Sequence, residues 1–122
     1  TKFEVATSAY PEYEGLRRAI AIHQAWGNKG DRYQQICQLS KYLWSQLQQI
    51  DRVSCLKTTP PEAGLVSFQV AGIEHKQLVD TLEQQGFLLR TIADPDCIRA
   101  CVHYLTLPEE IDSLLSAIKE NI

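Results

Sequence analysis

The sequence predicts an α+β fold, in which two N-terminal helices precede a small, mainly antiparallel sheet with helices on one face. Three observations lead to this prediction. Apolar residues recur with a helical period over residues 11–50, short alternating runs follow, and two further helical stripes interrupt those runs. The resulting order is two helices followed by β-β-α-β-β-α. Hairpin-like strand pairs with helices gathered on one side are typical of an α+β layer.

The composition is that of one globular domain. The chain has 122 residues, of which 44% are hydrophobic and 22% charged, and a single core typically occupies roughly 100–150 residues. No apolar run approaches the ~20 residues that cross a bilayer, which argues against a membrane-spanning role. The net charge of −3, without any block of like charge, is not typical of a nucleic-acid-binding protein.

The four cysteines indicate a reducing compartment. They are too few and too irregularly spaced for a disulfide scaffold, and no Cys-x-x-Cys pair is present to hold zinc. We therefore expect reduced thiols and a cytoplasmic location. The chain contains no Met and begins inside a structured-looking segment, so we expect either a processed protein or a piece of a longer one.

The N-terminal part predicts two helices. Thr1–Tyr10 is expected to be an extended lead-in, and Pro11 suits the first turn of a helix. This helix is predicted to reach Trp26, because the glycines that follow end it. Asp31 is the predicted N-cap of a second helix, whose apolar residues keep the 3.6-residue period as far as Ile50.

The pattern then changes from helical to extended. We expect strands over residues 53–56 and 64–70, because apolar and polar residues alternate there. The loop Thr58–Pro61 separates them, since no helix or central strand includes two consecutive prolines. A third helix is predicted between Ile73 and Gly86, with the glycine at its end.

The C-terminal part predicts a hairpin and a final helix. Strands over Phe87–Ile92 and Ile98–Leu105 flank a turn at Asp94-Pro95-Asp96. The segment Thr106-Leu107-Pro108-Glu109 matches a capping box with proline in the first turn of a helix. The apolar residues of that helix share one face, namely Ile111, Leu114, Leu115 and Ile118.

The hairpin carries the residues with the clearest chemistry. If it turns at Asp94-Pro95, Arg90 and Arg99 stand directly opposite one another, on the face away from the helices. Like charges in a cross-strand pair are destabilising, so the pair predicts either solvent-facing side chains or an anion bound between them. A carboxylate is the expected anion, because a guanidinium group donates two parallel hydrogen bonds to it.

Both interpretations of the arginines remain open from the pattern alone. In the first, both are solvated edge residues. The second is favoured by Leu88, Ile92 and Cys101, which fall on the same face and make it too apolar for open water, whereas antiparallel sheets usually leave one face polar. The residue pattern therefore predicts an α+β domain with an arginine-bearing face directed at a ligand, and it does not name a reaction.

The cysteines are mostly assigned to packing. Cys97 lies beside Arg99, where a nearby cation favours the thiolate, so a nucleophile is the alternative to a small buried residue. Cys37 and Cys55 are predicted to pack in the interior.

The histidines suggest no catalytic group. His23 is expected in the core or at an interface, and His75 is expected to be exposed at the start of a helix. His103 shares the arginine face and is a further candidate to contact an anion, but no partner for a triad is visible. The sequence also contains no Gly-rich phosphate loop or metal motif.

Three segments, which together span nearly the whole chain, carry a family resemblance. Phe3–Ile20 (FEVATSAYPEYEGLRRAI) is similar to a Phe-Glu-x-Gly-Thr segment that leads into a helix, and Gly64–Gly72 (GLVSFQVAG) to a strand before a His-Lys-x-Leu helix. Cys97–Ile118 (CIRACVHYLTLPEEIDSLLSAI) is similar to a Val-Arg-x-Ser strand followed by an Asn-Thr-x-Glu-Glu-Ile-Asp turn. Together they resemble the C-terminal small domain of the class V aminotransferase family, the pyridoxal-phosphate enzymes that include cysteine desulfurases. The chain departs from the pattern at Ala6, where Gly is usual, and at Leu105-Thr106, where Asn-Thr is common.

The resemblance implies a cofactor and a set of site residues. It implies that pyridoxal 5'-phosphate is bound mainly by a large N-terminal domain, which carries the Schiff-base lysine and has no counterpart here. We therefore expect residues 1–122 to be the small domain of a longer enzyme, inactive alone, with residues 1–30 as a connecting segment and first helix. The resemblance implies that Arg99 binds the substrate α-carboxylate and that Arg90 lines the same pocket. It also implies that Thr7 reaches the cofactor phosphate across the interface of a homodimer.

The short connection between the arginines favours one branch of the family. In desulfurases a loop there carries a nucleophilic cysteine, whereas here only the eight residues Thr91–Ile98 intervene. This resembles a cysteine or cystine C–S lyase, which forms pyruvate, ammonia and a persulfide usable in iron–sulfur cluster assembly. Cystine offers two carboxylates to the two arginines. The alternatives are a desulfurase with Cys97 as persulfide carrier, an epimerase or aminotransferase, and, from another class, an autonomous amino-acid-binding regulatory module.

Overall fold

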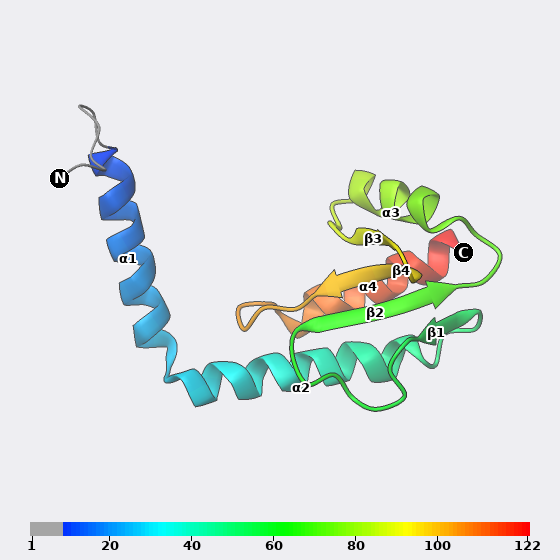
Figure 1. Ribbon diagram of the computed structural model, residues 1–122, viewed down its shortest axis with the longest axis horizontal. Helices are drawn as coiled ribbons and strands as arrows, with labels where there is room; N and C mark the ends of the chain where they lie inside the picture. Colours follow the sequence, from blue (N-terminus) through cyan, green and yellow to red (C-terminus); the bar gives the residue numbers. More distant parts are fainter. Residues whose placement is uncertain (1–8) are drawn as a thin grey trace. The chain divides into compact units, whose positions relative to one another are not determined.

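The computed structural model describes residues 9–122, which form two compact units with a boundary after Arg32. Thr7, for which the family resemblance implies a contact with the cofactor phosphate, lies outside the described residues, and so does Ala6. The α+β prediction is confirmed: within residues 9–122, four helices accompany one small antiparallel sheet (Figure 1).

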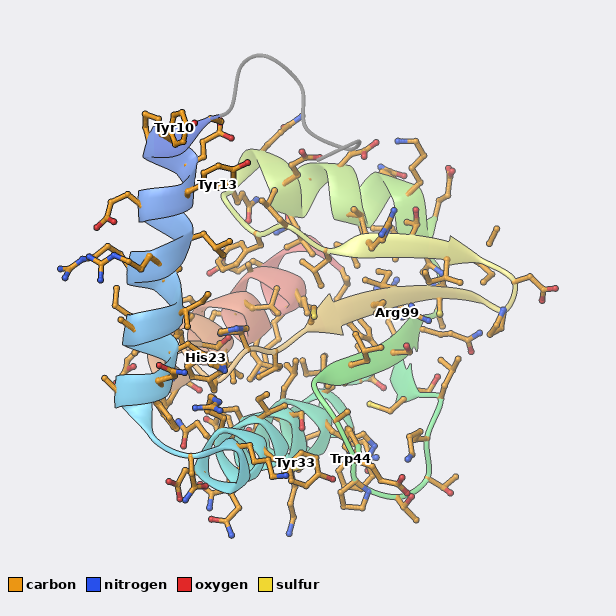
Figure 2. The ribbon with its side chains drawn as sticks, turned by 60° about the vertical axis from the view of Figure 1, so that its left-hand side comes forward. Tyr10, Tyr13, His23, Tyr33, Trp44 and Arg99 are labelled. Carbon is orange, nitrogen blue, oxygen red and sulfur yellow. The ribbon has the colours of Figure 1, made fainter. Side chains whose placement is uncertain are left out.

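The first unit contains α1 (Tyr10–Trp26), with Pro11 in its first turn as predicted. No side chain of this helix is buried, so His23 does not lie in the core, and its alternative position at an interface stays a prediction. Its surface carries aromatic and charged pairs. The rings of Tyr10 and Tyr13 meet edge to face with centroids 6.0 Å apart (Figure 2), and the Arg17 guanidinium donates two hydrogen bonds to the Glu14 carboxylate.

Helix α2 (Lys29–Leu47) begins three residues earlier than the predicted N-cap at Asp31 implies. The Asn28 side chain accepts a hydrogen bond from the Asp31 backbone N–H at 2.9 Å, and the Asp31 carboxylate accepts one from the Asn28 N–H at 3.0 Å. This reciprocal pair satisfies two amides that a helix start leaves free. Asp31 is therefore inside the first turn, and its assignment as N-cap is wrong.

The sheet has the strand order β1-β2-β4-β3, with every pair antiparallel. Its strands are β1 (Val53–Cys55), β2 (Leu65–Val70), β3 (Arg90–Ala93) and β4 (Asp96–Cys101). On β2, Val66, Phe68 and Val70 are buried as predicted, while their neighbours are not. This alternation places one face of the sheet against the helices.

The core joins that face to three helices. It includes residues of α2, α3 (His75–Gln84) and α4 (Pro108–Asn121), and in Figure 1 α4 runs along the sheet behind β2 and β4. The largest of its fully buried side chains are Phe68, Leu43, Leu47, Leu78, Leu82, Ile98 and Ile118. Burying such a side chain contributes about 1.5–3 kcal/mol, so this layer dominates the stability of the unit.

Two predicted strands are shorter than expected. The strand predicted from Phe87 begins only at Arg90, because Gly86 adopts a left-handed φ of +94° and the Phe87 N–H donates back to the Leu82 carbonyl, which closes α3. The strand predicted to reach Leu105 ends at Cys101. Beyond it the His103 N–H donates to Thr106 Oγ1, which forms a local turn.

The start of α4 also differs from the prediction. Leu107, and not Thr106, is the N-cap, and Pro108 follows it in the first turn. The Glu110 carboxylate accepts a hydrogen bond from the Leu107 N–H at 2.9 Å. Only the glutamate half of a capping box is formed, because the N-cap residue Leu107 has no side-chain acceptor.

Candidate functional site

Arg90 and Arg99 are register partners on β3 and β4, as the sequence predicts. Arg99 also pairs with Ser67 on β2, so its strand is hydrogen-bonded on both sides. Figure 2 shows Arg99 on the sheet between these neighbours. The register therefore places both arginine side chains on one face of the sheet, where like charges opposite one another are destabilising.

Both arginines line one depression of about 510 Å³ on the sheet. Its remaining lining residues are Leu65, Glu83, Leu88, Leu89 and Cys101. Leu88 is 81% exposed, which agrees with the expectation that this face carries apolar side chains next to the guanidinium groups. The depression therefore combines two cations, one carboxylate and an apolar rim.

One donor atom of Arg99 is unsatisfied. Its Nε is buried and has no hydrogen-bond partner among the described residues. A buried donor without a partner costs roughly 1–3 kcal/mol, and a bound carboxylate relieves that cost. Whether an anion relieves this cost at the arginine face stays a prediction from the sequence.

The cysteines occupy different environments. Cys97, which the sequence places next to Arg99 as a possible nucleophile, is 1% exposed and pairs with Ile92 in the hairpin. Cys101 is exposed and lines the depression. Cys37 and Cys55 are half-buried, and the Cys55 Sγ lies 3.7 Å from the Trp44 carbonyl oxygen. Burial raises the pKa of the Cys55 thiol to about 11.

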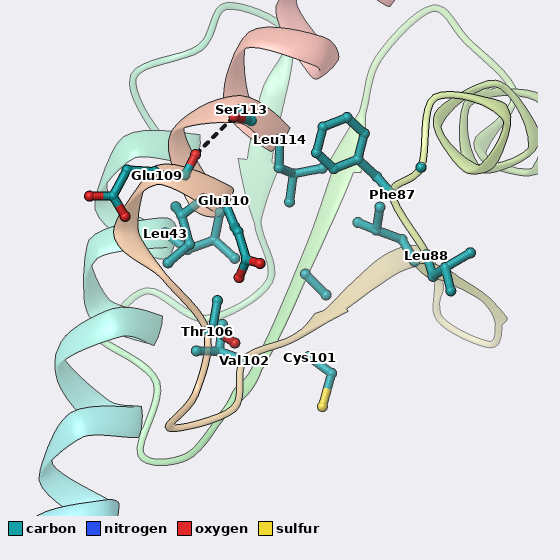
Figure 3. Close-up of a pocket in the computed structure, with 14 residues that line it drawn as sticks. Leu43, Phe87, Leu88, Cys101, Val102, Thr106, Glu109, Glu110, Ser113 and Leu114 are labelled. Carbon is teal, nitrogen blue, oxygen red and sulfur yellow. Dashed lines mark hydrogen bonds between the residues drawn. The ribbon is translucent and has the colours of Figure 1, made fainter.

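A second pocket, of about 530 Å³, is shown in Figure 3. Its lining shares Leu88, Leu89 and Cys101 with that of the depression. Its walls come from the start of α4 and the end of β4, and include Glu109 and Glu110. Leu43, Phe87, Val102 and Leu114 add apolar side chains. This pocket extends the site away from the arginines.

The histidines correct two expectations. His75 is 8% exposed, so its predicted exposure is wrong. Its Nε2 accepts a hydrogen bond from the Val70 N–H at 3.0 Å, and its Nδ1 lies 2.9 Å from the Asp96 carboxylate. His103 is in the turn after β4, where its ring stacks on Tyr104, and it is not among the residues that line the depression.

Sequence reasoning missed Glu83, Leu65 and the position of Cys101 at the junction of the two pockets. Glu83 belongs to α3, and only the packing of α3 beside the sheet brings it to the arginines. Within residues 9–122, no group of three His, Cys, Asp or Glu side chains is arranged to hold a metal ion. No helix among these residues has the length and apolarity to span a bilayer.

Comparison with known proteins places the chain among pyridoxal-phosphate (PLP) enzymes. Residues 1–114 match the class-V aminotransferase family. A probable cysteine desulfurase of Synechocystis sp. is 27% identical over 135 residues, which cover 99% of this chain and 32% of the relative.

Solved structures of a cystine C–S lyase and of a cysteine desulfurase also match the chain. A lysine-to-alanine mutant of C-DES, with glycine covalently linked to its PLP cofactor, is 55% identical with a TM-score of 0.89, over 97% of this chain and 31% of that one. The cystine C–S lyase C-DES in complex with its reaction product, cysteine persulfide, gives 55% identity and a TM-score of 0.88 over the same shares. The cysteine desulfurase CsdA of Escherichia coli shares the fold at 19% identity and a TM-score of 0.76, over 98% of this chain and 32% of that one. The chain spans about a third of the length of these relatives.

Proposed function

Because the chain belongs to the class V aminotransferase family, we propose that it forms the small domain of a longer PLP-dependent C–S lyase that acts on cystine. Its 55% identity with C-DES, over 97% of this chain, supports a lyase over the other activities of the family. In this proposal the domain binds and orients the substrate. The remainder of the longer protein supplies the lysine and most contacts to the cofactor.

The arginine depression carries the proposal. Arg99 binds the α-carboxylate of the reacting half of cystine, because its strand is hydrogen-bonded on both sides and its Nε lacks a partner among the described residues. Arg90, on the neighbouring strand, binds the distal carboxylate. Two carboxylates of one substrate then offset the repulsion between the two guanidinium groups.

The described residues fit a substrate-binding role beside the cofactor. The depression offers hydrogen-bond donors that can bind an anion, and no lysine is among its lining residues. When bound, pyridoxal phosphate supplies the electron sink for β-elimination. Thr7 is the residue of this chain proposed to reach its phosphate, and the described residues do not include it.

The position of Cys97 favours elimination over a desulfurase mechanism. A desulfurase thiol must reach the substrate sulfur, but Cys97 is 1% exposed within β4. Only Asp94 and Pro95 connect β3 to β4, which leaves no loop to carry a thiol outward. Elimination needs no enzyme thiol, because the C–S bond breaks after loss of the α-proton.

The proposed reaction converts cystine and water to pyruvate, ammonia and cysteine persulfide. The bond between Cβ and sulfur breaks, the leaving sulfur keeps the S–S bond as a persulfide, and water hydrolyses the remaining three-carbon fragment to pyruvate and ammonia. We propose in addition that the persulfide serves iron–sulfur cluster assembly, and that the enzyme is a cytoplasmic homodimer. The four free cysteines support a reducing location.

Product analysis of the full-length enzyme tests the proposal. With cystine, pyruvate and persulfide are expected in a 1:1 ratio, and the 122-residue chain alone is expected to produce neither. Formation of alanine from cysteine, with a persulfide on Cys97, contradicts the lyase assignment and supports the desulfurase alternative.

A further inference from the structure

The arginine depression also contains one carboxylate, that of Glu83 at the last turn of α3. Its side chain is exposed, and the described residues place no Lys, Arg or His nitrogen within ion-pair distance of it. Lys76, on the same helix, donates to the Asp80 carboxylate at 2.8 and 3.1 Å; this contact is the main cause of its raised pKa, to which the charge of Glu83 contributes least and only through space. The depression therefore contains the negative Glu83 and two positive arginines that form no ion pair with it.

Such an arrangement weakens the binding of a simple anion. A carboxylate beside two guanidinium groups lowers the positive potential that attracts an anion, unless it binds a cation of the same ligand. Glu83 does not satisfy the buried Arg99 Nε, which has no hydrogen-bond partner among the described residues. Glu83, Arg90 and Arg99 form no ion pair with one another, which fits a ligand that has both carboxylate and ammonium groups.

The charge count of the depression matches one substrate. Cystine carries two carboxylates and two amino groups, and the amino group of the reacting half is taken up by the reaction at the cofactor. Two carboxylates and one distal ammonium remain for the protein. The depression offers two guanidinium groups and one carboxylate.

We infer that Glu83 binds the distal α-ammonium of cystine, and so selects disulfides whose distal half is an amino-acid zwitterion. This inference rests on the proposed function. It adds a specificity-determining residue from α3 to the two arginines on the sheet. A disulfide with a distal carboxylate but no ammonium leaves Glu83 without a cation and is a poorer substrate.

Three disulfides separate the contributions in the full-length enzyme. Cystine carries both distal charges, the mixed disulfide of cysteine with 3-mercaptopropionate carries only the carboxylate, and that with cysteamine carries only the ammonium. Glu83→Gln is expected to lower kcat/KM roughly five- to tenfold for cystine and for the cysteamine disulfide, mainly through KM. It is expected to leave the mercaptopropionate disulfide within about twofold.

The controls decide what a failure means. Glu120→Gln removes an exposed carboxylate on α4, outside the depression, and is expected to change none of the three values. Equal losses by Glu83→Gln on all three disulfides, or no loss on any, overturn the assignment of Glu83 and leave the lyase intact. If the unmutated enzyme releases no pyruvate from cystine, the proposed function itself is wrong, and the inference falls with it.

Discussion

The Nε2 of His75 accepts a hydrogen bond from the Val70 backbone N–H at 3.0 Å, which ties the start of α3 to the end of β2. The opposite ring nitrogen contacts Asp96, the first residue of β4. A buried histidine thus joins three elements, and the Val70 amide fixes its tautomer, because Nε2 acts as an acceptor. Asp96 lies three residues before Arg99.

Removing this side chain leaves a buried amide without a partner. We expect His75→Ala to cost about 1–3 kcal/mol of stability and to speed hydrogen exchange in the segment that contains Val70. Exchange followed by mass spectrometry measures this locally. His23→Ala, an exposed histidine in α1, is the matched control. Unchanged protection of the Val70 segment in His75→Ala contradicts the expectation.

Two glycines provide a contrasting pair. A Cβ on Gly64 would stand 2.2 Å from the Val102 carbonyl oxygen, whereas one on Gly15 meets nothing within 4 Å. Gly64→Ala is expected to destabilise by about 1–3 kcal/mol, because the backbone must move. Gly15→Ala is expected to stabilise α1 by about 0.5–1 kcal/mol. Thermal denaturation followed by circular dichroism compares them, and equal midpoints for the two variants contradict the close approach.

The two arginines are expected to differ in their effect on substrates. Arg99→Ala should lower kcat/KM for every amino-acid substrate, because each loses a charge-assisted contact worth roughly 1.5–3 kcal/mol. Arg90→Ala should impair cystine much more than an S-alkyl-cysteine, which has no second carboxylate. Lysine at either position lacks the planar fork and should restore little. If Arg90→Ala lowers kcat/KM equally for both substrates, the assignment of cystine as the substrate loses its main support.

Replacement of Cys97 tests the mechanism. Cys97→Ala in the full-length enzyme is expected to retain most of its activity on cystine, because elimination uses no enzyme thiol. Cys101→Ala serves as a comparison, since that thiol is exposed in the depression. A loss of several hundredfold in Cys97→Ala contradicts the lyase mechanism.

The thiols are expected to react in an order set by burial. Burial raises the pKa of the Cys55 thiol from 9.0 to about 11, so its alkylation rate should rise only as the pH approaches 11. Since the folded pKa is the higher one, the corresponding stabilisation is present below pH 9 and is lost between about pH 9 and 11. Iodoacetamide labelling read by mass spectrometry should modify exposed Cys101 before Cys55. Fast labelling of Cys55 at pH 8 excludes this environment.

The hairpin was predictable because its register depends on local information. A turn at Asp94-Pro95 fixes which residues oppose one another, so the pairing of Arg90 with Arg99 follows from a count along two strands. The apolar faces of β2 and α4 were predictable for the same reason. The family resemblance extended these local patterns to a cofactor and a reaction, which the spacing of residues alone does not give.

The remaining features depend on tertiary contacts or on competing local signals. His75 looks exposed in sequence, but Val70 and Asp96 satisfy both of its nitrogens after folding. Glu83 reaches the depression only through the packing of α3. Asn28 and Asp31 are both suitable N-cap residues. The reciprocal hydrogen bonds between them make Asn28 the N-cap and place Asp31 in the first turn.

The sheet order places Arg99 on a central strand and Arg90 on an edge strand. Arg99 is on β4, which is bonded to strands on both sides, whereas Arg90 is on the four-residue edge strand β3, bonded only to β4. An edge strand can shift or change in sequence without breaking a second ladder. If Arg99 binds the α-carboxylate as proposed, a change at Arg90 on the edge strand can alter the range of substrates while the central strand keeps the α-carboxylate contact.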